Sequence, residues 1–311
     1  MRKIAMLGRL SAPLPCEGAL LMCLTSKNTR GEFTMRLALL ATAAGLALAT
    51  PAIADDHMGV TAERHQHHAA LKAAVASDAR GEDAQRDQWR HPFETLDFFQ
   101  VKPGMTVVDY MPAGGWYTRI LVPYLGSEGR YVGLTPDPAA ADAARFGEYF
   151  GGLPGKFEEA SPGWNLTGAP MSVYASQDVP EAMAGTVDRA LIFREMHNLL
   201  RSGVLYTELT RIRSMLKDDG MLGIVQHRAN EDAPGDYTNG SKGYLRQEDV
   251  IALVEAHGFE LVGMSDINAN PADPANWEGG VWTLAPSNSG DVAEAAPVGE
   301  SDRMTLLFAK R

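Results

Sequence analysis

The chain has 311 residues, of which 45% are hydrophobic, and carries a formal net charge of −11 at pH 7. That length suffices for one domain with a sizeable core. An acidic surface repels phosphate backbones and anionic lipids, so we expect neither nucleic acid nor a membrane surface as a partner. Both cysteines, Cys16 and Cys23, precede residue 54, which excludes disulfides, thiolate metal sites and a cysteine nucleophile from the remainder.

Residues 35–54 have the pattern of a secretory signal. One arginine precedes an apolar run of leucine and alanine, which ends at Ala52-Ile53-Ala54, an A-x-A cleavage site. The apolar run is shorter than the ~20 residues of a membrane-spanning helix; a buried core helix is the alternative. We therefore expect Met35 as the true start and residues 1–34 as an over-extended N-terminus. Cleavage near Ala54 would release a periplasmic or secreted protein without a stable membrane anchor.

Residues 55–90 are polar and rich in alanine, which predicts a helical lead-in. A histidine-rich tract of this kind can bind a divalent metal. Because nothing in the sequence fixes a ligand geometry, we favour a solvated helix face over a metal site. The histidines concerned are His57, His65, His67 and His68.

From residue 91 to 311 the patterns of helix and strand alternate. This predicts an α/β domain with a doubly wound, mostly parallel, seven-stranded sheet. No convincing helix separates the last two strands, so we expect the seventh strand to return antiparallel beside its neighbour. The predicted strands are 105–109, 129–134, 171–175, 187–193, 221–226, 259–267 and 304–310. The predicted helices are 92–99, 116–125, 139–149, 204–216 and 246–257.

The segments between these elements contain turns, long loops and an insert. Glycine and proline predict a long loop over residues 151–170, and Lys217–Gly220 predicts a turn. Residues 268–302 form a long insert that contains Trp277 and Trp282. It is either a cap over the substrate side or a surface loop packed over the sheet edge.

The stretch Val107–Thr118, VVDYMPAGGWYT, joins the first predicted strand to a helix. Its turn carries Gly114 and Gly115. Glycine suits a turn in which the backbone bends sharply and approaches a ligand so closely that a Cβ would clash. The stretch therefore predicts a small-molecule site at the end of the first strand.

This organisation resembles the class I S-adenosylmethionine-dependent methyltransferases from about Pro92 to Arg311. The resemblance rests on the strand order, on the Asp109–Gly115 turn, and on the LKDDG turn at Leu216–Gly220, which is similar to the LKPGG turn of that family. The segments FREMHNLLRSG, GYLRQEDVIALVEAHGF and GESDRMTLLFAKR are similar to a group of bacterial secreted proteins described as predicted methyltransferases. The resemblance implies a Rossmann-like fold, S-adenosylmethionine as cofactor, and methyl transfer to a small molecule.

The turn departs from the D-x-G-x-G-x-G pattern of that family. Met111 and Ala113 occupy the first two glycine positions, and we expect Met111 to crowd the approach of the cofactor's carboxylate. Thr135 stands where the family has an acidic residue for the ribose, with Asp137 as a substitute two residues later. Asp178 resembles the residue that contacts the adenine amine, with helix capping or loop solvation as the alternative. The cofactor-binding residues implied are Asp109, Gly114, Gly115, Thr135, Asp137 and Asp178.

Catalytic candidates follow the fourth and fifth strands, because ligands of parallel sheets lie outside the carboxyl ends of the strands. His197 is the first candidate for general base, since a free histidine has a pKa of about 6.5. His227 is the second, Glu195 lies nearby, and Arg228 is a candidate anion clamp. For each histidine the alternative is a structural hydrogen bond.

Two rival functions use the same residues. His197, Glu195 and His227 are of the types that bind Zn or Mn. Alternatively, the chain is a non-catalytic binding protein that kept the fold and lost the cofactor. The predicted export favours both rivals, because S-adenosylmethionine is made in the cytoplasm.

Overall fold

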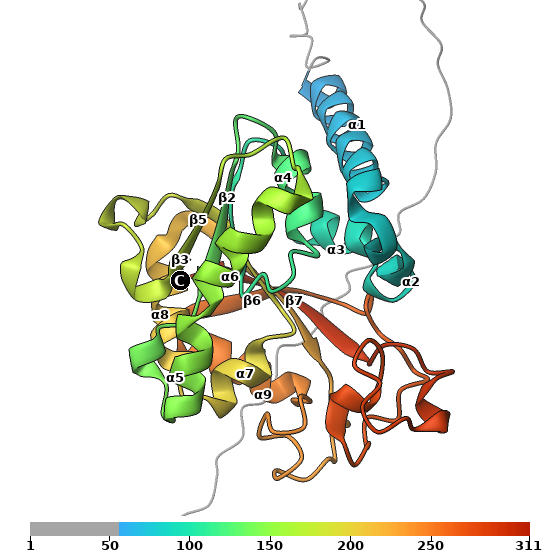
Figure 1. The fold of residues 1–311 in the computed structure, drawn as a ribbon. Helices are drawn as coiled ribbons and strands as arrows, with labels where there is room; N and C mark the ends of the chain where they lie inside the picture. Colours follow the sequence, from blue (N-terminus) through green and yellow to red (C-terminus); the bar gives the residue numbers. More distant parts are fainter. Residues whose placement is uncertain (1–55) are drawn as a thin grey trace, which may run out of the picture. The chain divides into compact units, whose positions relative to one another are not determined.

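The computed structural model describes residues 56–311, so the predicted signal and the residues before it lie outside the described part of the chain. A seven-stranded sheet runs through that part in the order β3-β2-β1-β4-β5-β7-β6 (Figure 1). Strands β1 to β5 are parallel, and β7 is antiparallel to β5 and β6, between which it lies. The predicted doubly wound sheet and its antiparallel last strand are therefore confirmed. The strands are β1 (Thr106–Tyr110), β2 (Arg130–Thr135), β3 (Met171–Ala175), β4 (Val187–Phe193), β5 (Leu216–His227), β6 (Phe259–Ser265) and β7 (Arg303–Lys310).

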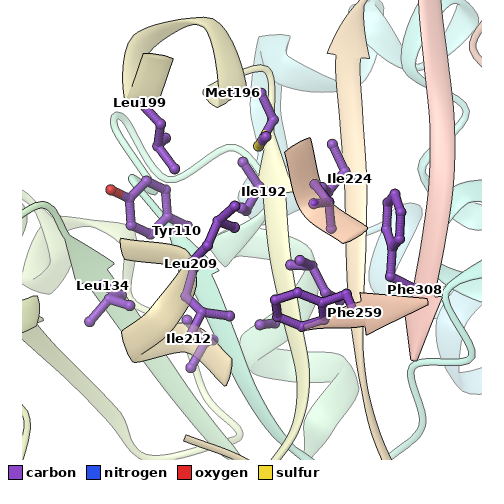
Figure 2. Packing of buried hydrophobic residues seen from close by; sticks show 14 of the residues in the cluster. Tyr110, Leu134, Ile192, Met196, Leu199, Leu209, Ile212, Ile224, Phe259 and Phe308 are labelled. Atoms are coloured by element: carbon purple, nitrogen blue, oxygen red, sulfur yellow. The ribbon is translucent and has the colours of Figure 1, made fainter. Parts of the chain in front are cut away.

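Successive residues of each strand point to opposite faces of the sheet. Because both faces carry apolar side chains, helices cover both. Val108 and Ile192 pack on the face covered by α7, α8 and α9. Their neighbours Val107 and Leu191 pack on the face covered by α1, α3 and α4. Figure 2 shows Ile192 with Met196 of α7 and Leu209 of α8. The helices are α1 (Asp56–Val75), α2 (Asp87–Arg90), α3 (Pro92–Phe98), α4 (Thr118–Leu125), α5 (Ala144–Gly151), α6 (Leu153–Ala160), α7 (Met196–Arg201), α8 (Leu205–Met215) and α9 (Gln247–Ala256).

The strand order reverses between β1 and β4. Chain order runs outward from β1 through β2 to β3 on one side, and from β4 onward on the other. At such a switch point the connections leave the sheet in opposite directions, which opens a crevice at the carboxyl ends of the two strands. The ends of β1 and β4 therefore position the candidate site.

One prediction about local structure was wrong, one helix was not predicted, and one predicted turn lies inside a strand. Residues 151–170 are not a plain loop, since they contain α6 and a short helical turn at Ser161–Trp164; Phe157 is buried and anchors α6, and Pro154 is tolerated in a first helical turn. Helix α7 begins directly after β4 and was not predicted. The Lys217–Gly220 turn lies within β5 as an irregularity, because Val187 pairs with Leu216 and Arg189 pairs with Met221.

The lead-in is helical as predicted, but it is not simply solvated. Helix α1 packs against α3 and α4, with Leu71 fully buried. His65 is exposed, while His68 Nε2 lies 2.8 Å from Asp97 Oδ1. Within residues 56–311, no three histidine, cysteine, aspartate or glutamate side chains are grouped to hold a metal ion. None of the helices in the same range is both long enough and apolar enough to cross a membrane.

Candidate functional site

The turn after β1 contains three residues with left-handed backbone. The φ angles of Met111, Ala113 and Gly115 are +53°, +47° and +77°. The Met111 amide donates to the Leu134 carbonyl at 2.7 Å, and the Gly115 amide donates to the Pro112 carbonyl at 2.9 Å. Such a conformation is strained for a methionine, and the surrounding structure has to maintain it.

Met111 does not project from the turn as expected. Its side chain is 8% exposed and packs in the core cluster that contains Tyr110 and Leu134. Met111 nevertheless lines both cavities beside the turn. That it crowds the cofactor's carboxylate therefore stays a prediction.

The two glycines of the turn have different reasons to be glycine. A Cβ on Gly115 would lie 2.5 Å from the ring of Trp164, whereas a Cβ on Gly114 would meet nothing within 4 Å. Gly115 is thus required by its positive φ and by the packing of Trp164, and its contact with a cofactor stays a prediction. Gly114 leaves open space on the site side.

Gly115→Ala is expected to lower the free energy of unfolding by roughly 1–3 kcal/mol, because the new Cβ combines a strained φ with a clash. Gly114→Ala is the matched control and is expected to change stability by less than about 0.5 kcal/mol, as is usual for surface positions. Urea denaturation measures both values. Equal destabilisation by the two variants would contradict this assignment.

Two cavities flank the turn at the carboxyl ends of the strands. The larger has a volume of about 410 Å³ and the smaller of about 200 Å³. Met111, Pro112, Ala113 and Glu195 line both, so the turn and Glu195 lie between one cavity and the other. The larger cavity is also lined by Asp83, Arg86, Arg90, Asp109, Gly114, Trp116, Tyr117, Arg119, Phe193, Arg194 and Pro286. The smaller is also lined by Thr135, Tyr149, Leu153, Lys156 and Phe157.

Besides Asp83, two acidic side chains line these cavities, and both have raised pKa values. Asp109 is 3% exposed and accepts a hydrogen bond of 2.8 Å from the Tyr131 hydroxyl. Burial raises the pKa of Asp109 to about 7. Burial likewise raises the pKa of Glu195 to about 7, although the hydrogen bond that Asn198 donates to its Oε2 at 2.5 Å lowers this pKa. Both carboxyl groups therefore exchange protons near neutral pH.

The two candidate histidines lie together, but away from the turn cavities. Their ring centroids are 5.7 Å apart. His197 Nδ1 is 3.4 Å from Gln226 Oε1, and His227 Nδ1 is 2.6 Å from Ser301 Oγ. Burial lowers the pKa of His197 to about 4 and that of His227 well below its usual value. Both rings are thus neutral at pH 7, and neither lines either of the two cavities.

The metal site predicted for His197, Glu195 and His227 is not formed. These residues do not make a metal-binding group, and the part of the chain from Asp56 onward offers none elsewhere. Each histidine has its Nδ1 beside an amide or hydroxyl partner, and the Glu195 carboxylate is bound by Asn198. Glu195 and His197 follow β4 and His227 ends β5, so positions after neighbouring strands did not suffice to bring the three side chains together around one ion.

The predicted cofactor residues separate into two groups. Asp109, Gly114 and Thr135 line the cavities. Asp137 does not, because its carboxylate accepts hydrogen bonds from the Ala139 amide (2.8 Å) and from Arg211 Nη1 (3.0 Å). Asp178 is exposed and accepts a hydrogen bond from Gln177. Contacts of Asp137 and Asp178 with a cofactor stay predictions.

Arginines are the main feature that sequence reasoning missed. Arg86, Arg90, Arg119 and Arg194 line the larger cavity, whereas Arg228, the predicted anion clamp, is paired with Asp302 and Asp266. The position of Arg194 directly after β4 is a signal that the pattern did contain. The sequence contains no such signal for Arg86 and Arg90, because their burial depends on Glu300, more than 200 positions away.

The long insert reaches the carboxyl end of β4. Pro286 lines the larger cavity, and the ring of Trp282 lies 5.9 Å from that of His197. Trp282 also lines a further cavity of about 380 Å³, together with Tyr149 and Asn198. The insert thus lies where the cap interpretation requires it.

No family model matches the chain. A segment of 73 residues is 34% identical to the ribosomal RNA small subunit methyltransferase H of Geobacter sulfurreducens, and it covers 22% of this chain and 24% of that protein. The match therefore spans about a quarter of the curated relative. A structural similarity is found to a SAM dependent methyltransferase from Aquifex aeolicus, with 17% identity, a TM-score of 0.41, and coverage of 65% of this chain and 93% of that one.

A second structural similarity is to the geranyl diphosphate C-methyltransferase from Streptomyces coelicolor A3(2). It has 12% identity and a TM-score of 0.45, and covers 86% of this chain and 89% of that one. That structure contains Mg²⁺, geranyl diphosphate and S-adenosyl-L-homocysteine. At these identities and TM-scores the similarities assign neither substrate nor cofactor to this chain.

Proposed function

We propose that the chain transfers a methyl group from S-adenosylmethionine to a small molecule. The observation that carries the proposal is the pair of cavities on either side of the Met111–Ala113 turn, with Glu195 lining both. They lie at the switch point of the sheet, where ligands of open α/β sheets bind. The architecture is the one that the resemblance to class I methyltransferases implies, and the matching segment of a curated methyltransferase supports the same reaction.

The residues around the turn fit this cofactor. The smaller cavity presents the apolar side chains of Tyr149, Leu153 and Phe157, which suit a purine, and the Thr135 hydroxyl, which suits a ribose. The larger cavity presents Asp109 for an ammonium group, with open space at Gly114. When bound, the cofactor supplies a methyl group that is already activated on a sulfonium.

The chain's own residues then have to orient the acceptor and remove its proton. Glu195 is the group that we propose as general base, because it lines both cavities and its pKa of about 7 lets it accept a proton near neutral pH. Asn198 orients the carboxylate through the hydrogen bond to Oε2. We assign His197 and His227 a structural role, since both are buried and their Nδ1 atoms lie beside Gln226 and Ser301.

S-adenosylhomocysteine is expected to raise the melting temperature of the protein. A ligand that binds only the native state stabilises it by about 2.7 kcal/mol at a concentration 100 times its Kd. A thermal-shift titration measures the effect, with adenosine alone as a weaker ligand for comparison. An unchanged melting temperature at millimolar S-adenosylhomocysteine would exclude methyl transfer from this cofactor and leave a non-catalytic binding protein as the better account.

We also propose that the protein acts outside the cytoplasm, after cleavage near Ala54. The A-x-A pattern before Asp55 supports this location. Mass spectrometry of the protein isolated from its host is expected to find an N-terminus at Asp55 in the periplasmic or secreted fraction. An uncleaved N-terminus in the cytoplasmic fraction would contradict the proposal.

A further inference from the structure

Three arginines share one buried carboxylate beside the larger cavity. Glu300 is 3% exposed and accepts hydrogen bonds from Arg86 Nε at 2.6 Å and from Arg90 Nε at 3.0 Å. It also forms an ion pair with Arg303, whose Nη2 lies 3.0 Å from Glu300 Oε2. Arg90 and Arg303 are each 2% exposed. We call these four residues the arginine cluster. It contains two more positive than negative charges. Uncompensated charge in such a buried place lowers the stability of the fold.

Part of the hydrogen-bonding capacity of the cluster is unused. Within residues 56–311, Nη1 and Nη2 of Arg90 and Nη2 of Arg86 are buried and have no hydrogen-bond partner. Arg90 also lies over the ring of Trp116, with its guanidinium carbon 4.8 Å from the ring centroid. Buried donors without partners are rare in proteins, and both arginines line the larger cavity. Arg86, whose side chain is 24% exposed, and Arg90 therefore bring uncompensated positive charge to the wall of a ligand-sized space.

The other charged groups of this cavity do not balance the excess. Asp83 is already paired with Arg119, at 2.5 Å between Oδ2 and Nη2. Burial raises the pKa values of Asp109 and Glu195 to about 7, which removes part of their negative charge. Arg194 adds a further positive charge. The cavity is thus suited to an anion, although the protein as a whole is acidic.

We propose that Arg86 and Arg90 bind an anionic group, a carboxylate or a phosphate, of the methyl acceptor in the larger cavity, so that the substrates are small organic anions. The inference rests on the proposed function. The cofactor itself is a poor partner for the excess charge, because its sulfonium, ammonium and carboxylate groups sum to one positive charge at neutral pH. An anionic acceptor compensates both the arginine cluster and the cofactor. Planar guanidinium groups match both oxyanions in geometry.

The test uses inorganic phosphate and malonate as probes of the two oxyanion classes. Each is titrated into the full chain at constant ionic strength, with chloride as the reference, and the melting temperature is recorded. We expect a saturable rise with at least one of them. Arg86→Gln is expected to weaken that binding about tenfold, the effect of losing one charge-assisted contact, and Arg86→Lys to weaken it less.

Arg64→Gln is the matched control, since Arg64 is exposed on α1 and lines a different cavity. It is expected to leave anion binding unchanged. Because Arg86 is partly exposed, its variants are expected to fold, and their urea midpoints check this. The proposal is overturned if neither anion stabilises the wild-type protein more than chloride does, or if Arg86→Gln binds the anions as well as the wild type does.

A second experiment tests whether the arginines bind a carboxylate of the acceptor or the carboxylate of the cofactor. The affinity of S-adenosylhomocysteine is compared with that of 5′-methylthioadenosine, which lacks the amino-acid carboxylate. We expect Arg86→Gln to leave both unchanged. A loss for S-adenosylhomocysteine alone would assign the site to the cofactor and overturn the assignment to the acceptor. If S-adenosylhomocysteine does not bind while the anions do, the proposed methyl transfer fails and the anion site stands.

Discussion

Glu195→Gln is expected to lower the rate of methyl transfer by roughly 100- to 10,000-fold, the usual contribution of a positioned general base. Glutamine keeps the size of the side chain and its contact with Asn198, but it cannot take up the proton. Cofactor affinity is therefore expected to change little. The measurement is the single-turnover formation of S-adenosylhomocysteine with an anionic acceptor that the wild-type protein methylates.

The pH dependence separates a base from a structural role. The pKa of Glu195 lies near 7, and only the deprotonated form accepts a proton, so the wild-type rate is expected to rise about tenfold per pH unit below 7 and to level off above it. Glu195→Gln is expected to lose this rise. Glu158→Gln, on the exposed side of α6, is the matched control. A variant at Glu195 with the wild-type rate and pH profile would exclude Glu195 as the base.

Glu300→Gln is expected to destabilise the fold by about 3–5 kcal/mol, the range found when one partner of a buried ion pair is removed. Arg86, Arg90 and Arg303 would be left without the carboxylate that they share. Urea denaturation at pH 7 measures the loss. Glu294→Gln, at an exposed position of the same insert, is the control. A loss at Glu300 no greater than at Glu294 would show that the cluster is compensated in another way.

The pKa of Glu300 predicts how the stability of the fold depends on pH. Burial raises the pKa of Glu300, but the neighbouring arginines outweigh it and hold the pKa at about 2, below the usual value of 4.5. A group whose pKa is lowered by folding contributes stability that is present above its unfolded pKa. That contribution is lost as the pH falls from about 4.5 to about 2. Glu300→Gln is expected to flatten the stability curve in this range.

The hydrophobic pattern was sufficient to predict the sheet. Runs such as Ala190–Phe193 are buried on both faces in a parallel sheet, so they appear in the sequence as continuous apolar segments. The missing helix before the last strand likewise predicted its antiparallel direction. Helix α6 was missed because Pro154 and Gly155 are typical of loops, and only the burial of Phe157 against the sheet distinguishes the two.

The site was predicted less completely, because its properties depend on burial. The sequence placed His197 and Glu195 after the same strand and favoured the histidine for its ordinary pKa. Burial reverses that preference by lowering the pKa of His197 to about 4 and raising that of Glu195 to about 7. The arginine cluster joins residues 86 and 90 to residue 300, and no local pattern predicts such a contact.

The central claim is that the cavities beside the Met111–Ala113 turn bind S-adenosylmethionine. Calorimetric titration of the protein with S-adenosylhomocysteine tests it most directly, with Ala113→Phe as the blocking variant and Ala139→Phe as the matched control. Ala113 is exposed and lines both cavities, whereas Ala139 is exposed outside them. We predict one molecule bound per chain by the wild type and by Ala139→Phe, and none by Ala113→Phe. Equal binding by Ala113→Phe, or no binding by the wild type, would contradict the claim.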